Sequence, residues 1–458
     1  MAEHHGQHGG HRHGHDRPHA HPPTEGLLSV EEALERVLGL VSPLHAVEVP
    51  LLEADGLALA EDVLAPFDIP GMDNSAMDGY AVRSEDVSGS STGCPVTLAV
   101  VGQVQAGALP TVGVGPGQAV RIMTGAPMPK GADAIVPWEF TDEPARRAAG
   151  GPITQIAITH PVTEGEHLRP AGEDLARGER VLGAGTVLTP PALGLLASVG
   201  RASVRAVRRP RVAVLATGDE VLAPGAPYTP GRLYDANSMG IAAALRRWGA
   251  EPVLLGIARD DRDDLRAKVR AGLDADMLIT SAGVSAGAFD YVKEVLAELG
   301  SMAFWAVKMR PARPIAGGLL TAPDGRRVPH LGLPGNPVSA LVALVEFARP
   351  AVAVLRGAHP EPLPRVRAVL ADGLLNPDGR RVYARVVLER TGGRLVAHLT
   401  GSQGSNLLTS MAAAHGLAIC PEDEPQRPAG AEADVELLDW LPSPLRDLQR
   451  REGGPHDN

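Results

Sequence analysis

The segment from Arg211 to Leu333 alternates apolar strands with amphipathic helices, and this alternation limits the fold more than any other feature of the chain. Val212–Ala216, Pro252–Ile257, Met277–Thr280 and His330–Leu333 are short apolar runs, as expected for strands that are buried on both faces. Helical patterns separate the first three runs. The segment is therefore predicted to form a doubly wound, parallel α/β domain.

Glycine-rich and acidic turns follow the ends of these strands. They are Thr217-Gly218-Asp219-Glu220, Asp260-Asp261, the segment from Ser281 to Gly287, and Pro334-Gly335-Asn336-Pro337. Ligands of open α/β sheets bind beyond the carboxyl ends of the strands. Glycine allows close approach of an anion, and a helix N-terminus favours negative charge by about 0.3–1 kcal/mol. The pattern indicates a phosphate-bearing ligand, although turns and helix caps require the same residue types.

Four carboxylates, Asp219, Glu220, Asp260 and Asp290, also lie near these strand ends. Two carboxylates about 4 Å apart repel each other by about 4 kcal/mol at an effective dielectric constant of about 20, so a cation would relieve their convergence. Oxygen ligands beside a phosphate suit Mg²⁺, and Glu220 and Asp290 are the candidate ligands. The alternative is that Asp219 and Asp260 cap helices and that Glu220 is solvated.

A basic run follows the α/β pattern. It contains Lys308, Arg310 and Arg313. Strand alternation predicts that Lys308 and Arg310 share one face, and arginine can bind an oxyanion through two donors. A solvated strand edge is the alternative interpretation.

Domains rich in β-strands flank the α/β segment. A capping box at Ser29 starts a helix in an elongated N-terminal domain, which we assign to residues 27–66 and 168–205. Short β-rich runs predict an inserted β domain at 67–167, and alternating strands predict a C-terminal β domain at 358–441, after the α/β domain at 206–357. Residues 1–26 and 442–458 are expected to be tails. The turns Asn74–Ala81 and Met123–Pro129, taken alone, are typical of tight turns.

Composition excludes several classes of protein. The net charge of −11 argues against nucleic acid or an anionic membrane as the main partner. Two distant cysteines suit a reducing cytoplasm, and the sequence contains no P-loop, no GxGxxG after a strand and no HExxH motif. No apolar run reaches the ~18 residues that a membrane span needs. Eight of the 16 histidines lie within the first 21 residues, which predicts either a disordered tail or a weak Ni or Zn buffer.

Six motifs occur in an order that is typical of one known family. They are Ser75–Tyr80, Met123–Pro127, Gly172–Asp174, Ala216–Glu220, Thr280–Asp290 and Gly332–Pro337. On these motifs the chain, over roughly residues 27 to 441, resembles the molybdopterin molybdenumtransferases of the MoeA type and is similar to the E domain of gephyrin.

The resemblance implies a homodimer whose site lies between the α/β domain of one subunit and the inserted β domain of the other. The implied reaction converts molybdate and adenylyl-molybdopterin to molybdenum-molybdopterin and AMP, with Mg²⁺ required. A pterin adenylyltransferase is an expected partner. The alternatives are that the chain is itself a molybdopterin adenylyltransferase, or that it is a non-enzymatic scaffold of the gephyrin type.

The resemblance also carries over individual site residues. Positions that match the family's catalytic residues are Asp78, Thr124, Asp174, Glu220, Asp260 and Asp290, of which Asp78 and Thr124 would act from the partner subunit. Positions that match residues binding the pterin, its phosphate, AMP or molybdate are Gly218, Ser281, Gly283, Ser285, Lys308, Arg310, Arg313, Pro334, Gly335, Asn336 and Ser405.

The chain departs from the family pattern at several of these places. Ala282 replaces a glycine that many relatives have before the Gly-Val-Ser loop, and Ala312 replaces the glycine of a usual Pro-Gly-Lys-Pro. Ala306 stands where some relatives have lysine, and Arg169 stands alone where some have consecutive arginines. We therefore expect the anion pocket to be rebuilt around Lys308, Arg310 and Arg313.

Overall fold

A computed structural model describes residues 27–282 and 291–440 of the chain. The predicted tails, Gly283, Ser285 and Asp290 lie outside the described residues. The chain divides into two compact units, which are described separately below. The first joins the segment up to Leu44 with the chain from Arg209 onward, and the second spans His45–Arg208.

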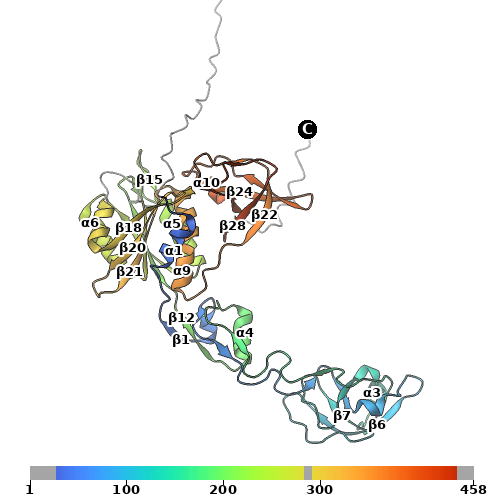
Figure 1. The fold of residues 1–458 in the computed structure, drawn as a ribbon. Coiled ribbons are helices and arrows are strands. Elements are labelled where there is room, and N and C mark those ends of the chain that lie inside the picture. The colour runs from blue at the N-terminus through green and yellow to red at the C-terminus, as the bar shows by residue number, and fades with distance from the viewer. Residues whose placement is uncertain (1–26, 283–290, 441–458) are drawn as a thin grey trace, which may run out of the picture. The chain divides into compact units, whose positions relative to one another are not determined.

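A six-stranded sheet forms the centre of the first unit (Figure 1). Its strand order is β16 (Glu251–Ala258), β13 (Arg211–Thr217), β17 (Met277–Ser281), β21 (Arg327–Leu333), β20 (Pro314–Thr321) and β18 (Gly300–Ala306). The first four strands are parallel, which confirms the predicted α/β class. The expectation of an entirely parallel sheet was wrong for β20 and β18. Both pair in antiparallel fashion, because the short links β18–β20 and β20–β21 leave no room for a crossover helix.

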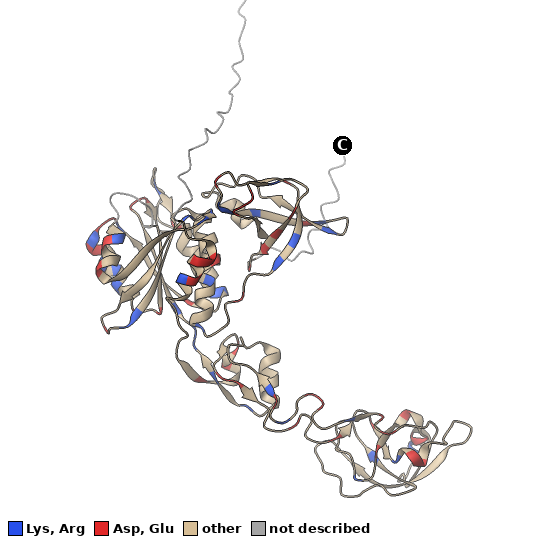
Figure 2. Cartoon of the chain, in the orientation of Figure 1, with Lys and Arg blue, Asp and Glu red and all other residues tan. Residues whose placement is uncertain are grey.

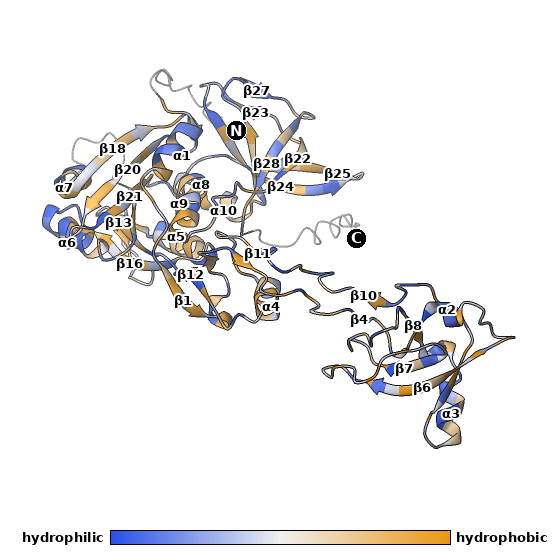
Figure 3. Cartoon of the chain, turned by 60° about the horizontal axis from the view of Figure 1, so that its bottom comes forward, coloured by the Kyte–Doolittle hydropathy of each residue, from blue (hydrophilic) through white to orange (hydrophobic). Residues whose placement is uncertain are grey.

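Helices cover both faces of this sheet. Val212 and Val214 of β13 pack in one cluster, together with α1 (Val30–Leu38), α5 (Ala236–Arg247) and α8 (Pro337–Ala343). Ala213 and Leu215 pack in the other, with α6 (Arg262–Gly272) and α7 (Tyr291–Leu299). Apolar strands therefore lie between two helical layers (Figure 3), and α6 is rich in charged residues (Figure 2).

Helix α1 begins where the sequence predicts. Ser29 Oγ accepts from the N–H of Glu32, and the Glu32 carboxylate accepts from the N–H of Ser29 at 2.8 Å. The apolar side of the helix, including Val30, Ala33 and Val37, is buried in the α/β core. Tertiary packing thus joins this helix to the α/β domain, although it precedes that domain by some 170 residues.

The helix that follows β21 is long and apolar. It runs through α8, a π-helical turn η3 (Leu344–Ala348) and α9 (Arg349–Leu355). By length and composition its 19 residues, Pro337–Leu355, are able to cross a membrane, but 72% of the stretch is buried inside the unit. We therefore assign it as a core helix of the sheet.

The C-terminal part of the first unit is a β domain around its own apolar core. Its strands run in the order β19 (Met309–Arg310), β24 (Arg381–Thr391), β25 (Arg394–Leu399), β22 (Arg365–Leu370), β28 (Glu432–Leu437) and β26 (Gly416–Cys420). Strand β24 also pairs with β26, so the sheet closes into a barrel. The small elements of this part are β23 (Leu374–Leu375), β27 (Gln426–Arg427) and α10 (Leu408–Ala412).

The second unit contains two β layers with separate cores. In one, β1 (Ala46–Pro50), β12 (Ser203–Val207) and β2 (Ala58–Leu59) pack against α4 (Pro190–Ser198). In the other, the sheet order is β8 (Ala134–Pro137), β5 (Gly79–Val82), β7 (Gln118–Ile122), β6 (Val96–Val104) and β9 (Gln155–Ile158), with α3 (Glu143–Ala149). The pairs β3 (Val63–Leu64) with β11 (Arg180–Leu182) and β4 (Asn74–Ser75) with β10 (Leu168–Arg169) complete the described ladders.

Candidate functional site

A cavity of about 1030 Å³ opens at the carboxyl ends of β13, β17 and β21. Strand-end loops of the α/β domain form one wall, and the β domain contributes a loop at 403–408 together with Arg380. The predicted residues that line it are Glu220, Ser281, Arg310, Arg313, Pro334, Gly335, Asn336 and Ser405. Positions separated by up to 185 residues therefore share one enclosed volume.

Asn237 ties two of the strand-end loops together. Its side-chain nitrogen donates to Ser281 Oγ at 2.7 Å and to the carbonyl of Gly335 at 2.8 Å. Asn237 lies in the first turn of α5 and does not cap the helix. Asp235 is the N-cap of α5 and accepts from the N–H of Ser238 at 2.9 Å, which leaves the Asn237 side chain free to bridge the loops.

Asn336 links the α/β domain to the β domain. It is the N-cap of α8, with Pro337 in the first turn. Its side chain makes no hydrogen bond to its own helix and instead donates to Ser405 Oγ at 3.1 Å. The N–H of Val338 also donates to the carbonyl of Ser405 at 3.0 Å. The N-terminal ends of α5 and α8 both line the cavity, and each favours a bound anion.

Three arginines, Arg310, Arg313 and Arg380, supply positive charge to the cavity. Asp378 lies between two of them, with its carboxylate 2.9 Å from Arg380 Nε and 3.7 Å from Arg310 Nη1. Burial lowers the pKa of Arg310, and the charge of Asp378 opposes this effect. The Asp378 carboxylate thus holds two like charges close together at the wall of the cavity.

Arg385 organises the loop that brings Ser405 to the cavity. Its side chain is 1% exposed, and its guanidinium donates to the carbonyls of Gln403 at 3.1 Å, Ser402 at 3.3 Å and Gly404 at 3.0 Å. Nε donates to Ser410 Oγ at 2.9 Å. Because a peptide unit is planar and trans, the N–H groups of Gln403, Gly404 and Ser405 point away from Arg385. Sequence reasoning missed Arg385, and the detectable signal was one arginine inside the apolar run 382–388.

Several predicted residues do not line the cavity. Lys308 was expected to share a face with Arg310, but strand β19 covers only Met309–Arg310. The backbone of Lys308 is bonded on both sides instead, because its N–H donates to the carbonyl of Leu28 and its carbonyl accepts from Arg381. Asp260 lies beside Asp219, whose carboxylate accepts from its N–H at 3.2 Å.

Gly218 does not line the cavity directly but allows Glu220 to do so. It has a φ of +127°, and a Cβ at this position would come within 2.4 Å of the Glu220 carboxylate. Asp261, the residue after Asp260, caps α6 by accepting from the N–H groups of Asp263 and Asp264. The cap predicted at Asp260 therefore lies one residue further along the chain.

Two residues that depart from the family pattern, Ala282 and Ala312, have an unusual backbone conformation. Ala282 and Ala312 have φ values of +77° and +76°, in the left-handed region that L-residues with a side chain rarely adopt. Both line the cavity. Glycine would adopt this geometry without steric cost, which accounts physically for the glycines expected at these two positions.

In the second unit, Asp78 and Thr124 form one polar pair. The Asp78 carboxylate accepts from the N–H and from Oγ1 of Thr124, each at 2.7 Å. The backbone bond is the main reason that the pKa of Asp78 is lowered, followed by the hydroxyl bond. Asp174, in the same unit, is exposed and donates its N–H to the carbonyl of Ile69.

The neighbouring strand anchors this turn through a buried ion pair. Arg121 Nη2 lies 2.8 Å from Glu143, whose side chain is 3% exposed, and the charge of Arg121 adds to the lowering of the Asp78 pKa. Within residues 27–282 and 291–440, no group of three or more His, Cys, Asp or Glu side chains is arranged to hold a metal ion.

The fold defines an α/β protein whose arginine-lined cavity is shared with a β barrel. Three stretches of the chain match known family models. Residues 28–200 match the MoeA N-terminal region (domain I and II), residues 213–354 match a probable molybdopterin binding domain, and residues 367–438 match the MoeA C-terminal region (domain IV).

Whole-chain relatives support the same assignment. Molybdopterin molybdenumtransferase 2 of Mycobacterium tuberculosis is 40% identical over 416 residues, covering 89% of this chain and 99% of that protein. The molybdopterin molybdenumtransferase of Nostoc sp. is 37% identical, covering 88% and 92%. The crystal structure of the molybdopterin biosynthesis MoeA protein from Pyrococcus horikoshii OT3 matches 90% of this chain with a TM-score of 0.74 and 27% identity. The chain belongs to the molybdopterin molybdenumtransferase family.

Proposed function

We propose that the cavity binds molybdate and adenylylated molybdopterin and releases molybdenum-loaded molybdopterin and AMP. As a member of its family the chain is a transferase of molybdenum cofactor biosynthesis. The observation that carries the proposal is a cavity of about 1030 Å³ whose lining combines three arginines with two helix N-termini. Such a volume suits a ligand of nucleotide size, and the donors suit its phosphates and an oxyanion.

The residues divide into two groups by their chemistry. Arg310, Arg313 and Arg380 are the donors we assign to molybdate, because a guanidinium binds a tetrahedral oxyanion through two parallel N–H groups. Ser281 and the N-terminal ends of α5 and α8 are the donors we assign to the phosphates. Fixed donors of this kind stabilise developing negative charge without reorganising.

The proposal includes Mg²⁺, with Glu220 as one of its ligands. Mg²⁺ in such sites is often bound by one or two carboxylates plus substrate phosphates. Glu220 and Asp235 are the described carboxylates that line the cavity, and Asp235 already caps α5. The ion would neutralise phosphate charge when bound. Asp290, the second expected ligand, lies outside the described residues.

The remaining roles come from the family resemblance. We propose that Asp78 and Thr124 act from the partner subunit of a homodimer, with Asp174 and Asp260 as further acidic positions. The exposed Asp78–Thr124 pair and the lowered pKa of Asp78 support a carboxylate that stays ionised at neutral pH. We also propose that the protein acts in a reducing cytoplasm. Its substrate would come from a pterin adenylyltransferase.

Turnover of adenylyl-molybdopterin with molybdate and Mg²⁺, followed by AMP release, tests the function. We expect Arg310→Ala to lower kcat/KM at least tenfold, which corresponds to about 1.4 kcal/mol. Arg367→Ala is the matched control, because Arg367 pairs with Glu432 and Asp434 on the outside of the same β domain. ATP consumption without molybdate by the wild type would favour the adenylyltransferase alternative instead.

A further inference from the structure

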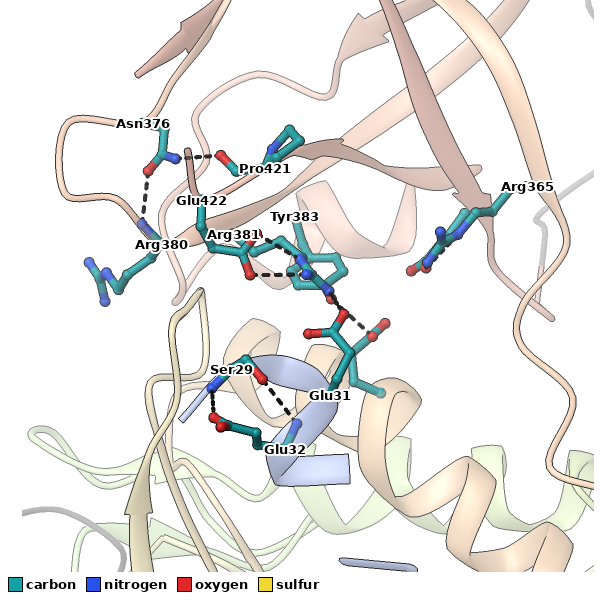
Figure 4. Close-up of polar contacts among 12 residues, drawn as sticks. Ser29, Glu31, Glu32, Arg365, Asn376, Arg380, Arg381, Tyr383, Pro421 and Glu422 are labelled. Atoms are coloured by element: carbon teal, nitrogen blue, oxygen red, sulfur yellow. Dashed lines mark hydrogen bonds and ion pairs between the residues drawn. The ribbon is translucent and has the colours of Figure 1, made fainter. Parts of the chain in front are cut away.

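A polar cluster lies where the β domain meets the core helix of the α/β domain. Tyr383 of β24 and Arg365 of β22 project toward this contact from the β domain (Figure 4). Glu346 belongs to the π-helical turn η3, and Glu436 to β28. Tyr383 Oη lies 3.1 Å from Glu346 Oε2, so a hydrogen bond crosses between the two domains.

Glu436 is buried, and one of its oxygens lacks a donor among the described residues. Its side chain accepts from Arg365 Nη2 at 2.7 Å and from Nε at 3.1 Å, and both bonds go to Oε1. Oε2 is buried and has no hydrogen-bond partner in the described part of the chain. A buried acceptor of this kind costs about 1–3 kcal/mol unless a donor reaches it.

Glu346 lies close enough to Glu436 for a hydrogen bond between the two side chains. Two ionised carboxylates would repel each other there, whereas a proton on Glu346 makes it the missing donor. Burial, followed by the charge of Glu436, raises the pKa of Glu346 from 4.5 to about 8. Tyr383 and Arg349, the other groups near it, oppose the rise.

The cations around Glu346 are engaged elsewhere: Arg349 donates to the carbonyl of Glu361 at 2.8 Å and forms no ion pair with Glu346 among the described residues. Arg365 is engaged by Glu436, and Arg381 lies 2.6 Å from Glu31 of α1 and 3.0 Å from Glu422 (Figure 4). These contacts join α1, β24 and the turn that follows β26. They do not bring Arg365 or Arg381 into an ion pair with Glu346. The pairing of Glu346 with Glu436 therefore depends on a proton.

We propose that Glu346 and Glu436 share one proton, and that this proton latches the β domain to the α/β domain and keeps the two walls of the cavity together. The two carboxyls lie on elements that lead directly to the cavity. Turn η3 continues α8, whose N-terminus lines the cavity, and Arg380, which also lines it, precedes β24. Loss of the proton at alkaline pH places two negative charges in the contact and loosens it. The catalytic consequence rests on the proposed function, but the latch itself does not.

The sign of the pH effect follows from the raised pKa. Between pH 4.5 and about 8 the folded chain holds a proton that the unfolded chain has lost. The stability that this proton gives is fully present below pH 4.5 and is lost as the pH rises through about 8. The unfolding equilibrium constant should therefore rise by up to tenfold per pH unit in this window.

Glu346→Gln is the decisive variant, because the amide donates to Glu436 and accepts from Tyr383 without titrating. Its matched control is Glu389→Gln, on the same strand β24, where Glu389 pairs with the half-exposed His398. We expect opening of the β domain, measured by amide hydrogen exchange corrected for intrinsic rates, to increase between pH 6 and 8 in the wild type and in the control. In Glu346→Gln the increase should be at least tenfold smaller. Equal pH profiles in all three proteins overturn the latch.

Two further measurements keep the test decisive. If Glu346→Gln does not fold, infrared difference spectra of the wild type should show a protonated carboxyl that titrates near pH 8, and its absence also overturns the proposal. In the turnover assay, the KM for molybdate should rise above pH 8 in the wild type but not in Glu346→Gln, with kcat changed less. An inactive wild type at pH 7 would instead count against the proposed function and leave the exchange result to decide the latch.

Discussion

Replacing Arg385 by methionine should release the loop that carries Ser405. Arg385 makes four hydrogen bonds to this loop and to Ser410. At about 1.5 kcal/mol for each bond from a charged donor, the set stabilises the native state by about 6 kcal/mol. Burial opposes this, because it lowers the pKa of Arg385 to about 10, which corresponds to roughly 3 kcal/mol of lost hydration. The expected net loss in Arg385→Met is therefore about 3 kcal/mol.

The assay for this prediction must be local, because a chain with several cores does not unfold in one step. Amide exchange of residues 402–405 and of β24 should accelerate by about 100-fold, the equivalent of about 3 kcal/mol. The KM for molybdate should rise at least tenfold, since Ser405 lies at the cavity wall. Arg385→Lys, with one nitrogen in place of three, should give intermediate values.

A matched control is Arg394→Met, which removes an exposed arginine from β25 of the same barrel. Its exchange rates should stay within threefold of the wild type. If Arg385→Met also stays within threefold and keeps its KM, the assignment of Arg385 as the organiser of the loop is wrong.

Three further predictions follow from the described contacts. Ala282→Gly should stabilise the α/β domain by about 0.5–1 kcal/mol in denaturant titrations, because relief of the left-handed geometry outweighs the added freedom of the unfolded chain; a loss of stability would contradict this. The Asp78 carboxylate should titrate below pH 3.8 by NMR, so its bonds weaken only as the pH falls through that lower value; in Thr124→Val the midpoint should move upward, and an unchanged midpoint would exclude the hydroxyl bond. Glu143→Ala should destabilise the second unit by about 3–5 kcal/mol, measured on its thermal transition, because Arg121 loses its buried partner; a shift as small as that of an exposed pair would refute this.

The local chemistry of the sequence determined the elements of the fold. Apolar runs long enough for buried strands predicted β13, β16, β17 and β21 to within three residues at each end, and the Ser29 capping box predicted the start of α1. These features depend on hydrogen bonds and side-chain periodicity within a few residues, so one sequence window contains them. The ordered motifs likewise identified the family that the comparisons confirm.

Other features were decided by partners far away in the sequence. Asn237 bridges two loops because Asp235 already caps α5. Lys308 lies outside the cavity lining, and its backbone bonds to Leu28 and Arg381. Arg385 acts on a loop about 18 residues later, and the proton between Glu346 and Glu436 requires two domains in contact.

One physical reason explains why some features follow from the local sequence and others only from the tertiary structure. Helix caps and strand periodicity are set by hydrogen bonds to near neighbours, whose identity is written in the sequence around each residue. Burial of a charge, a shared proton or a bridging amide depends on the dielectric surroundings and on the group that arrives opposite, and only packing of distant segments supplies these. The sequence therefore determined the family, the α/β domain and eight of the residues that line the cavity, whereas tertiary structure decided which side chains hold its walls together.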